Sequence, residues 1–243
     1  MVQNDKAYKL LALQEGISNR AAKELIDRGV VYASGKKILL ARADMKSDTV
    51  FKVSKLQKPK IIFEDDNIAA VDKPPFLTSE EIAQSFKLTL LHRLDKETSG
   101  VLLLSKNDEF TQKVISTFKS RKVEKTYLAI VSGKLAEPIT IDTPLLVTKT
   151  KSGAFTKPSK NGQDAISVVT PRLIEGKRSM VEVAIQTGRT HQIRAHLKSI
   201  GFPVVGDEQY GGKPSSRIML HAWKISLLGY SFESPPPSEF KLS

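Results

Sequence analysis

The sequence predicts an α+β fold in which strands outnumber helices and the two kinds of element do not alternate regularly. Helical periodicity beyond residue 60 is confined to 108–119 and 191–200. A chain of 243 residues is long enough for one large domain or two smaller ones. Short apolar runs bounded by turn-forming residues predict strands at 61–63, 68–71, 101–105, 127–131, 168–169 and 180–185.

Residues 7–55 have the pattern of a separate small unit. An apolar helix is expected to end at Gly16, after which Ser18 occupies an N-cap position where its hydroxyl can accept a backbone N–H. The second helix is expected to end at Gly29, because glycine adopts the left-handed conformation that closes many helices. Strand signals then follow at 30–32 and 50–53.

The segment 55–60 is polar, basic and interrupted by Pro59, which is typical of a linker. We therefore predict two domains, 1–57 and 58–243. The first holds eleven basic and six acidic side chains, a formal charge of +5, while the much longer second domain carries +7. A further basic stretch, 148–162, contains no acidic residue and is expected to be a mobile loop.

Charge and composition narrow the function classes. The formal net charge of +12 favours a polyanionic partner, with nucleic acid first and an acidic membrane surface second. The absence of cysteine excludes disulfide scaffolds, cysteine nucleophiles and cysteine-based zinc modules. No apolar run exceeds five residues and the first six residues lack a signal-peptide pattern, so we expect a cytoplasmic protein that does not span a membrane.

The first candidate site is the segment 92–100, His-Arg-Leu-Asp-Lys-Glu-Thr-Ser-Gly, which precedes a buried strand signal. Asp95 would lie in a turn at the mouth of that strand, where functional carboxylates are often presented. A plain polar turn is the alternative interpretation of the same pattern.

The second candidate is the segment 186–197. Thr190 is expected to cap a helix whose apolar stripe includes Ile193 and Leu197. His191, Arg194 and Lys198 would then share the opposite face, as a cationic ridge suited to phosphates or to a carboxylate partner. A solvated basic helix face is the alternative.

Several other chemistries are disfavoured by spacing. His191 and His196 are five residues apart, which separates them around a helix, so no metal site is expected. No segment matches a Walker or dinucleotide-binding glycine loop, and no serine has the small-residue surroundings of a hydrolase nucleophile.

The segment 92–100 closely resembles the catalytic signature of RNA pseudouridine synthases, in the subfamily that modifies large-subunit ribosomal RNA and, in some members, tRNA. The resemblance extends in order over roughly 61–228, with further matches at Lys73-Pro74, 125–129, 188–194 and 220–222. It implies a mixed, largely antiparallel central sheet with flanking helices and a catalytic cleft. It also implies no cofactor or metal, RNA as partner with ribosomal RNA before tRNA, no DNA, and a monomer by default.

The resemblance assigns roles residue by residue. Asp95 matches the nucleophile, which would attack either the uracil ring or the sugar after the uridine is flipped out of its stack. Arg194 matches the residue that pairs with it, and Tyr127 the tyrosine that packs on the uracil. Arg93 matches the arginine that fills the vacated space. Among the substrate-binding residues we also place Leu220, as an apolar wall with a core role nearly as plausible, and His191.

Residues 7–55 are similar to the small α/β RNA-binding module named after small-subunit ribosomal protein four. Within it, Ser18, Arg20, Lys23 and Arg28 are the predicted RNA-binding residues, because the three cations lie near one helical face. A basic appendage that contacts no RNA is the alternative.

The sequence departs from the family after Lys73-Pro74, where the glycine and the following His-Pro-Gly segment are missing. The departure leaves the choice of RNA open. Two alternative functions are a non-catalytic RNA-binding or ribosome-assembly protein on the same scaffold, and a hydrolytic enzyme using Asp95 with Glu97. The second would need two carboxylates held a few ångströms apart, which Lys96 between them disfavours.

Overall fold

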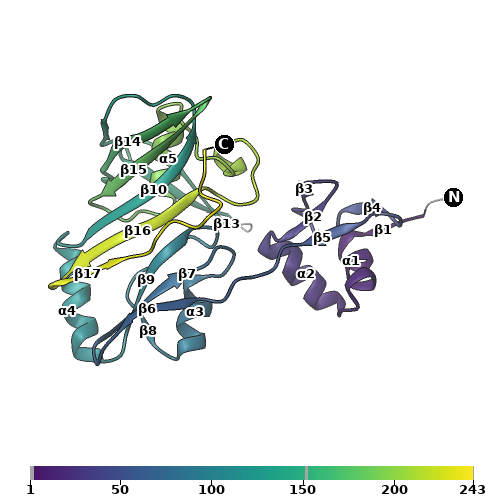
Figure 1. Ribbon diagram of the computed structural model, residues 1–243, viewed down its shortest axis with the longest axis horizontal. Coiled ribbons are helices and arrows are strands. Elements are labelled where there is room, and N and C mark those ends of the chain that lie inside the picture. Colours follow the sequence, from purple (N-terminus) through teal and green to yellow (C-terminus); the bar gives the residue numbers. More distant parts are fainter. Residues whose placement is uncertain (1–2, 151–152, 243) are drawn as a thin grey trace. The chain divides into compact units, whose positions relative to one another are not determined.

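The computed structural model describes residues 3–150 and 153–242, and the chain divides into two compact units, Met1–Lys58 and Pro59–Ser243 (Figure 1). The first unit contains two helices and two small sheets. Its elements are β1 (Asn4–Lys6), α1 (Ala7–Glu15), α2 (Asn19–Arg28), β2 (Val31–Ala33), β3 (Lys36–Lys37), β4 (Asp44–Lys46) and β5 (Phe51–Val53).

The predicted ends of both helices in the first unit are confirmed. Gly16 and Gly29 adopt left-handed conformations at the C-caps, and the Ser18 hydroxyl accepts the Ala21 N–H at 3.1 Å. The strands predicted at 30–32 and 50–53 appear, within one residue, as the neighbours β2 and β5. The pair β1–β4 was not predicted, because three-residue strands without alternation leave little signal.

The second unit is built on a ten-stranded mixed sheet, which confirms the α+β class. Its main order is β11-β14-β15-β10-β16-β9-β7-β6, and β9–β16 is its one parallel pairing among the described residues. The strands are β6 (Lys60–Glu64), β7 (Ile68–Lys73), β8 (Thr89–Leu90), β9 (Ser99–Ser105), β10 (Glu124–Ser132), β11 (Ile139–Ile141), β14 (Ser167–Glu175), β15 (Arg178–Ile185), β16 (Leu220–Leu227) and β17 (Tyr230–Glu233). The helices are α3 (Ser79–Phe86), α4 (Asp108–Lys119), α5 (Gln192–Ser199) and the short η1 (Glu208–Tyr210).

Strand β9 is covered on both faces, which explains why its sequence is continuously apolar. Val101 and Leu103 pack with residues of α4, while Leu102 and Leu104 pack with residues of α3 on the opposite face. The apolar side of α5, predicted from Ile193 and Leu197, joins a separate core with β10 and β15. The sheet therefore holds the start of β9, the middle of β10 and the start of α5 in fixed relation.

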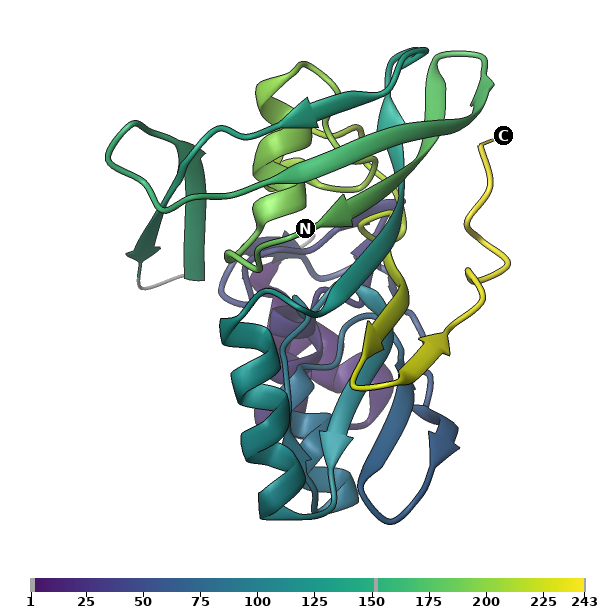
Figure 2. The ribbon, with the colours of Figure 1, turned by 90° about the vertical axis from the view of Figure 1, so that its left-hand side faces the viewer.

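One expectation needs correction. The basic stretch 148–162 is largely a β-hairpin of β12 (Leu145–Thr150) and β13 (Gly153–Pro158), which stands out beside the sheet in Figure 2. Lys151, which the expected loop included, lies outside the described residues.

Three further elements have no prediction from the sequence. Helix α3 is only eight residues long, β16 carries polar residues on both faces, and β17 is only four residues long.

No helix in the described parts of the chain is both long enough and apolar enough to cross a membrane.

Candidate active site

Asp95 lies in the loop between β8 and β9, and the backbone on both sides of it is held by the segment that follows β7. The Ser79 hydroxyl accepts the Leu94 N–H at 2.9 Å and lies 3.2 Å from the Leu94 carbonyl. On the other side, the Lys96 carbonyl accepts the Phe76 N–H at 2.8 Å. Because neighbours on both sides are fixed, the position of the Asp95 carboxylate depends little on its own loop.

Lys73, the residue of the Lys-Pro motif, is fully buried beneath this loop. Its ammonium donates to the carbonyls of Pro74 at 3.0 Å, Leu77 at 2.6 Å and Lys96 at 3.1 Å. Burial, followed by the positive charge of Arg217, lowers the pKa of Lys73 to about 7. The ammonium therefore joins the segment that follows β7, through Pro74 and Leu77, to the Asp95 loop, through Lys96.

The end of the 92–100 motif is fastened to β16. Arg217 donates to the Ser99 hydroxyl at 2.6 Å, and that hydroxyl lies 2.7 Å from His221 Nδ1. His221 Nε2 lies 2.9 Å from the Ser234 carbonyl, so all polar atoms of this buried chain find partners. Gly100 has a φ of 112°, and a Cβ there would lie 2.1 Å from the Ala222 carbonyl oxygen. The motif's serine and glycine therefore permit close parallel pairing of β9 with β16.

Arg194 joins two carboxylates. Its Nε and one terminal nitrogen donate to Asp207 at 2.6 and 3.0 Å, and the other terminal nitrogen donates to Asp95 at 3.0 Å. Burial alone would lower the pKa of Arg194, but Asp207 and then Asp95 offset burial and raise it above its usual value. A guanidinium fixed from behind by Asp207 can orient the Asp95 carboxylate without moving itself.

His191 begins α5 and lies on the other side of Asp95. It adopts a left-handed conformation with φ 54° as the N-cap residue, so the expectation that Thr190 caps the helix is wrong. The Tyr210 hydroxyl accepts the Thr156 N–H at 2.8 Å and lies 3.1 Å from His191 Nδ1, to which it can donate. Burial lowers the pKa of His191, so the ring is neutral, with Nε2–H toward Asp95 at 3.8 Å.

Tyr127 and Leu220 lie in the same pocket as Asp95. The pocket is open at its mouth, and its empty space, with the solvent at the mouth included, is about 440 Å³. Tyr127 comes from the middle of β10, and burial followed by the charge of Asp95 raises its pKa, so it is a neutral phenol. Leu220 is buried in the core and also forms part of the pocket wall. We call this the central pocket; its lining includes Leu94, Asp95, Tyr127, Ile185, His191, Arg194 and Leu220.

Arg93 lies at the rim of the central pocket rather than inside it. Its side chain is 77% exposed and pairs with Glu80 at 2.9 Å. The predicted cationic ridge of α5 is right in part, because Arg194 is buried and meets carboxylate partners as expected, whereas Lys198 is exposed and does not share its surroundings. The alternative of a fully solvated basic face is wrong, because Arg194 is buried.

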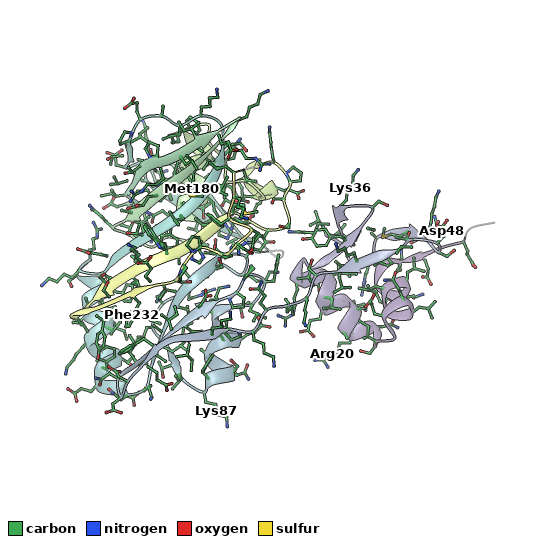
Figure 3. The ribbon with its side chains drawn as sticks, viewed as in Figure 1. Arg20, Lys36, Asp48, Lys87, Met180 and Phe232 are labelled. Atoms are coloured by element: carbon green, nitrogen blue, oxygen red, sulfur yellow. The ribbon has the colours of Figure 1, made fainter. Side chains whose placement is uncertain are left out.

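The predicted RNA-binding residues of the first unit differ in availability. Arg20 is exposed and projects from α2 (Figure 3). Lys23 lies over the Tyr8 ring with its ammonium 4.2 Å from the ring centre, and Arg28 pairs with Glu24 at 2.7 Å. Ser18 caps the helix, so its hydroxyl has a structural partner.

The sequence does not predict three residues of the site, Asp207, Gln209 and Tyr210, which lie on or just before η1. Gln209 accepts from Arg194 at 2.9 Å and donates to the Ala154 carbonyl at 3.0 Å. Only a glycine-rich segment with two acidic residues, 206–212, marks the region, and that pattern does not show which arginine it would meet. Within the described residues no group of three or more histidine and acidic side chains could hold a metal ion.

Comparison with known proteins identifies the family. The family model for RNA pseudouridylate synthase matches residues 54–199. An uncharacterized RNA pseudouridine synthase of Helicobacter pylori is 52% identical, over 98% of this chain and 100% of its own. The ribosomal large subunit pseudouridine synthase C of Rickettsia felis is 34% identical, over 74% of this chain and 67% of its own. The solved structure of human RNA pseudouridylate synthase domain containing 1 covers 78% of this chain and 87% of its own, with a TM-score of 0.64 and 25% identity. The chain therefore belongs to the RNA pseudouridylate synthase family, whose members are isomerases.

Proposed function

We propose that this protein converts specific uridines of structured RNA, foremost large-subunit ribosomal RNA, to pseudouridine, with Asp95 as the nucleophile. In this isomerisation the bond from uracil N1 to the sugar C1′ breaks and a bond from C5 to C1′ forms. The C5 proton is lost, and N1 gains one, so no cofactor or co-reactant is consumed. The observation that carries the assignment is the Asp95 carboxylate, which Arg194 holds in a pocket that Tyr127 and Leu220 also line.

The neighbours of Asp95 support separate roles. Arg194 orients the carboxylate and compensates its charge, while Tyr127 and Leu220 form apolar walls against which a uracil ring can pack. As a neutral phenol, Tyr127 can relay a proton near C5 but is not a standing base. His191, also neutral, can donate from Nε2 to a uracil carbonyl. Arg93 at the rim is free enough to enter the space that a flipped base leaves.

The choice of RNA rests on the relatives. Homologues from Rickettsia felis and Nitrosomonas europaea are named ribosomal large subunit pseudouridine synthases. We extend that substrate to this chain, with tRNA as the second choice. The first unit would act as an RNA-binding module similar to that of small-subunit ribosomal protein four, contacting phosphates through Arg20 and its neighbours. A cytoplasmic location is part of the same proposal.

The test is pseudouridine mapping by carbodiimide labelling and primer extension on total RNA from cells with and without the gene. We expect one or more labelled uridines in large-subunit ribosomal RNA to disappear with the gene. They should return with the wild-type protein and stay absent with Asp95→Asn, which keeps the size of the side chain. Restoration by Asp95→Asn would refute the nucleophile, and an unchanged map would leave an RNA-binding or ribosome-assembly role on the same scaffold.

A further inference from the structure

A second pocket adjoins the central pocket on the side of α4 and the start of β10. It shares Arg93, Tyr127 and Arg189 with the central pocket and has about 1130 Å³ of empty space, the solvent at its open side included. We call it the lateral pocket. Its distinguishing members are Phe118, Lys119, Arg121 and Lys125, none of which has a role in the reaction proposed above.

The lateral pocket differs in charge from a third pocket, which lies on the hairpin side of Asp95. The described lining of the lateral pocket holds five Lys or Arg residues and no carboxylate. The pocket on the hairpin side of Asp95 holds four Lys or Arg residues but also Glu80, Asp95 and Glu97. Because the described lining of the lateral pocket holds no carboxylate, an anion there meets a larger excess of positive charge than on the hairpin side.

Lys125 is the best placed of these cations. It lies on β10 two residues before Tyr127, and its half-buried ammonium stands 5.6 Å from the centre of the Phe118 ring. Its hydrogen bond to the Thr187 carbonyl is long, at 3.4 Å, and no carboxylate of the described residues lies within ion-pair distance. Most of the hydrogen-bonding capacity of this ammonium is therefore available to a ligand, and no carboxylate of the described residues neutralises its charge.

The surroundings explain why this ammonium is suited to an anion. Burial lowers the pKa of Lys125 to about 8, because the pocket walls replace part of its hydration. Arg121, in the turn that joins α4 to β10, faces the same space and makes only a long contact of 3.9 Å with Asp164. A phosphate between the two cations would be held by charge-assisted hydrogen bonds without displacing a strong internal salt bridge.

We propose that the lateral pocket is a phosphate subsite, in which Lys125 and Arg121 bind the phosphodiester group next to the target uridine. The inference rests on the proposed function, because it places the uridine in the central pocket. Such a contact fixes the register of the RNA strand, so that one particular nucleotide meets Asp95. It also places the neighbouring nucleotide on the α4 side of the central pocket, and the second experiment below determines whether that nucleotide is 5′ or 3′ of the uridine.

The first experiment needs no knowledge of the natural target. Binding of single-stranded fluorescein-labelled octauridylate is measured by anisotropy between about 50 and 300 mM KCl. For Lys125→Met we expect the slope of log affinity against log salt to become shallower by about 0.7, the value for one single-strand phosphate contact. Lys125→Arg should keep the wild-type slope.

The matched control is Lys113→Met, which removes the same net charge from the exposed face of α4, where Lys113 pairs with Glu109 at 2.7 Å. It should leave the slope unchanged. An equal slope in wild type and Lys125→Met, or an equal loss in Lys113→Met, overturns the subsite. If Lys125→Met does not fold, as judged by its melting temperature, Arg121→Gln is measured in its place with the same expectation.

The second experiment uses a synthetic RNA that spans the mapped uridine, with a single neutral methylphosphonate on either side of it. One of the two replacements should weaken binding to the wild-type protein several-fold and have no further effect on Lys125→Met, because both changes remove the same contact. Additive losses at both positions contradict the proposal. Pseudouridine formation by the wild type is measured separately. If no pseudouridine forms but the salt slopes of wild type and Lys125→Met still differ, the proposed reaction at Asp95 is refuted and the phosphate subsite is not.

Discussion

Arg194 shows how one side chain can serve stability and chemistry together. Its guanidinium donates to Asp207, which is 1% exposed, to Asp95 in the central pocket, and to Gln209. Removing it would leave Asp207 as a buried charge without its partner, at a cost of about 3–5 kcal/mol. We therefore expect Arg194→Ala to lose stability as well as activity.

The informative substitution is Arg194→Lys, which keeps the charge. A lysine cannot span both carboxylates, so Asp95 should lose its fixed orientation. We expect kcat to fall about 100-fold while KM changes less than about threefold. Single-turnover kinetics on the mapped RNA measure the effect. An unchanged kcat would show that a positive charge, and not the bidentate geometry, is what Asp95 requires.

His92 leads to a prediction about pH. Its Nε2 accepts the Leu103 N–H at 3.2 Å, which requires a neutral ring. Burial, followed by the charge of Lys125, lowers the pKa of His92 to about 4, against 6.5 for a free side chain. The unfolded chain binds the proton more readily between these values, so this contribution to stability is complete above pH 6.5 and is lost as pH falls toward 4.

The difference between the two pKa values corresponds to at most about 3 kcal/mol. Urea unfolding of wild type should show this loss between pH 6.5 and 4. In His92→Gln, the glutamine side chain can still accept the Leu103 N–H but does not titrate. Its free energy of unfolding should therefore fall less between pH 6.5 and 4 than that of wild type, by the contribution of His92. The comparison is needed because burial also lowers the pKa values of His191, His196 and His221. Parallel curves for the two proteins would refute the assignment.

At the scale of elements, the pairing of β9 with β16 depends on Gly100. Its positive φ and the 2.1 Å approach of a Cβ to Ala222 are two separate penalties. Gly176 has a φ of 58° with nothing near its Cβ position, so Gly176→Ala carries the first penalty alone. We expect Gly100→Ala to lower the free energy of unfolding by at least about 2 kcal/mol more than Gly176→Ala. Equal losses in denaturant titrations would show that the strands can separate at little cost.

The β12–β13 hairpin is attached to the site through Tyr210, whose ring stacks on Phe155 at 5.1 Å and whose hydroxyl accepts the Thr156 N–H. Tyr210→Phe keeps the stacking and removes the acceptor. We expect faster hydrogen exchange at the Thr156 amide and a lower kcat, because His191 loses the hydroxyl at its Nδ1. Tyr230→Phe, which removes a hydroxyl bonded to Asp65 away from the pocket, is the control. Unaltered exchange at Thr156 would contradict this attachment.

Sequence patterns predicted these elements unevenly, for physical reasons. Helix α4 was predicted at its observed ends, 108–119, because periodicity and capping residues agree. The hairpin segment has the sequence pattern of a loop, because its strands are largely exposed, rich in lysine and without an apolar alternation. Among site residues, Asp95, Tyr127 and Arg194 lie in recognisable motifs, whereas Asp207 acts through a side-chain contact thirteen positions away. Such contacts follow from the folded backbone and leave no local pattern.

At the scale of the whole molecule, the chain divides into two compact units, and the residues of the candidate active site all belong to the second. If the first unit contacts RNA phosphates, a protein consisting of Pro59–Ser243 should bind the mapped RNA more weakly and with a shallower salt slope. Arg20→Gln in the full chain should reproduce part of the change, about one phosphate contact. An identical slope for the truncated and complete proteins would show that the first unit makes no such contact.

The order of strands in the sheet also determines when the two halves of the site can come together during folding. Strand β16 lies between β9 and β10, and so joins a half that carries Asp95 to a half that carries Tyr127 and Arg194. Residues 220–227 follow all three of these side chains in the sequence, so the two halves of the site can meet only after β16 has been made and has paired with both. A partly folded chain that lacks this strand is therefore expected to have no assembled site.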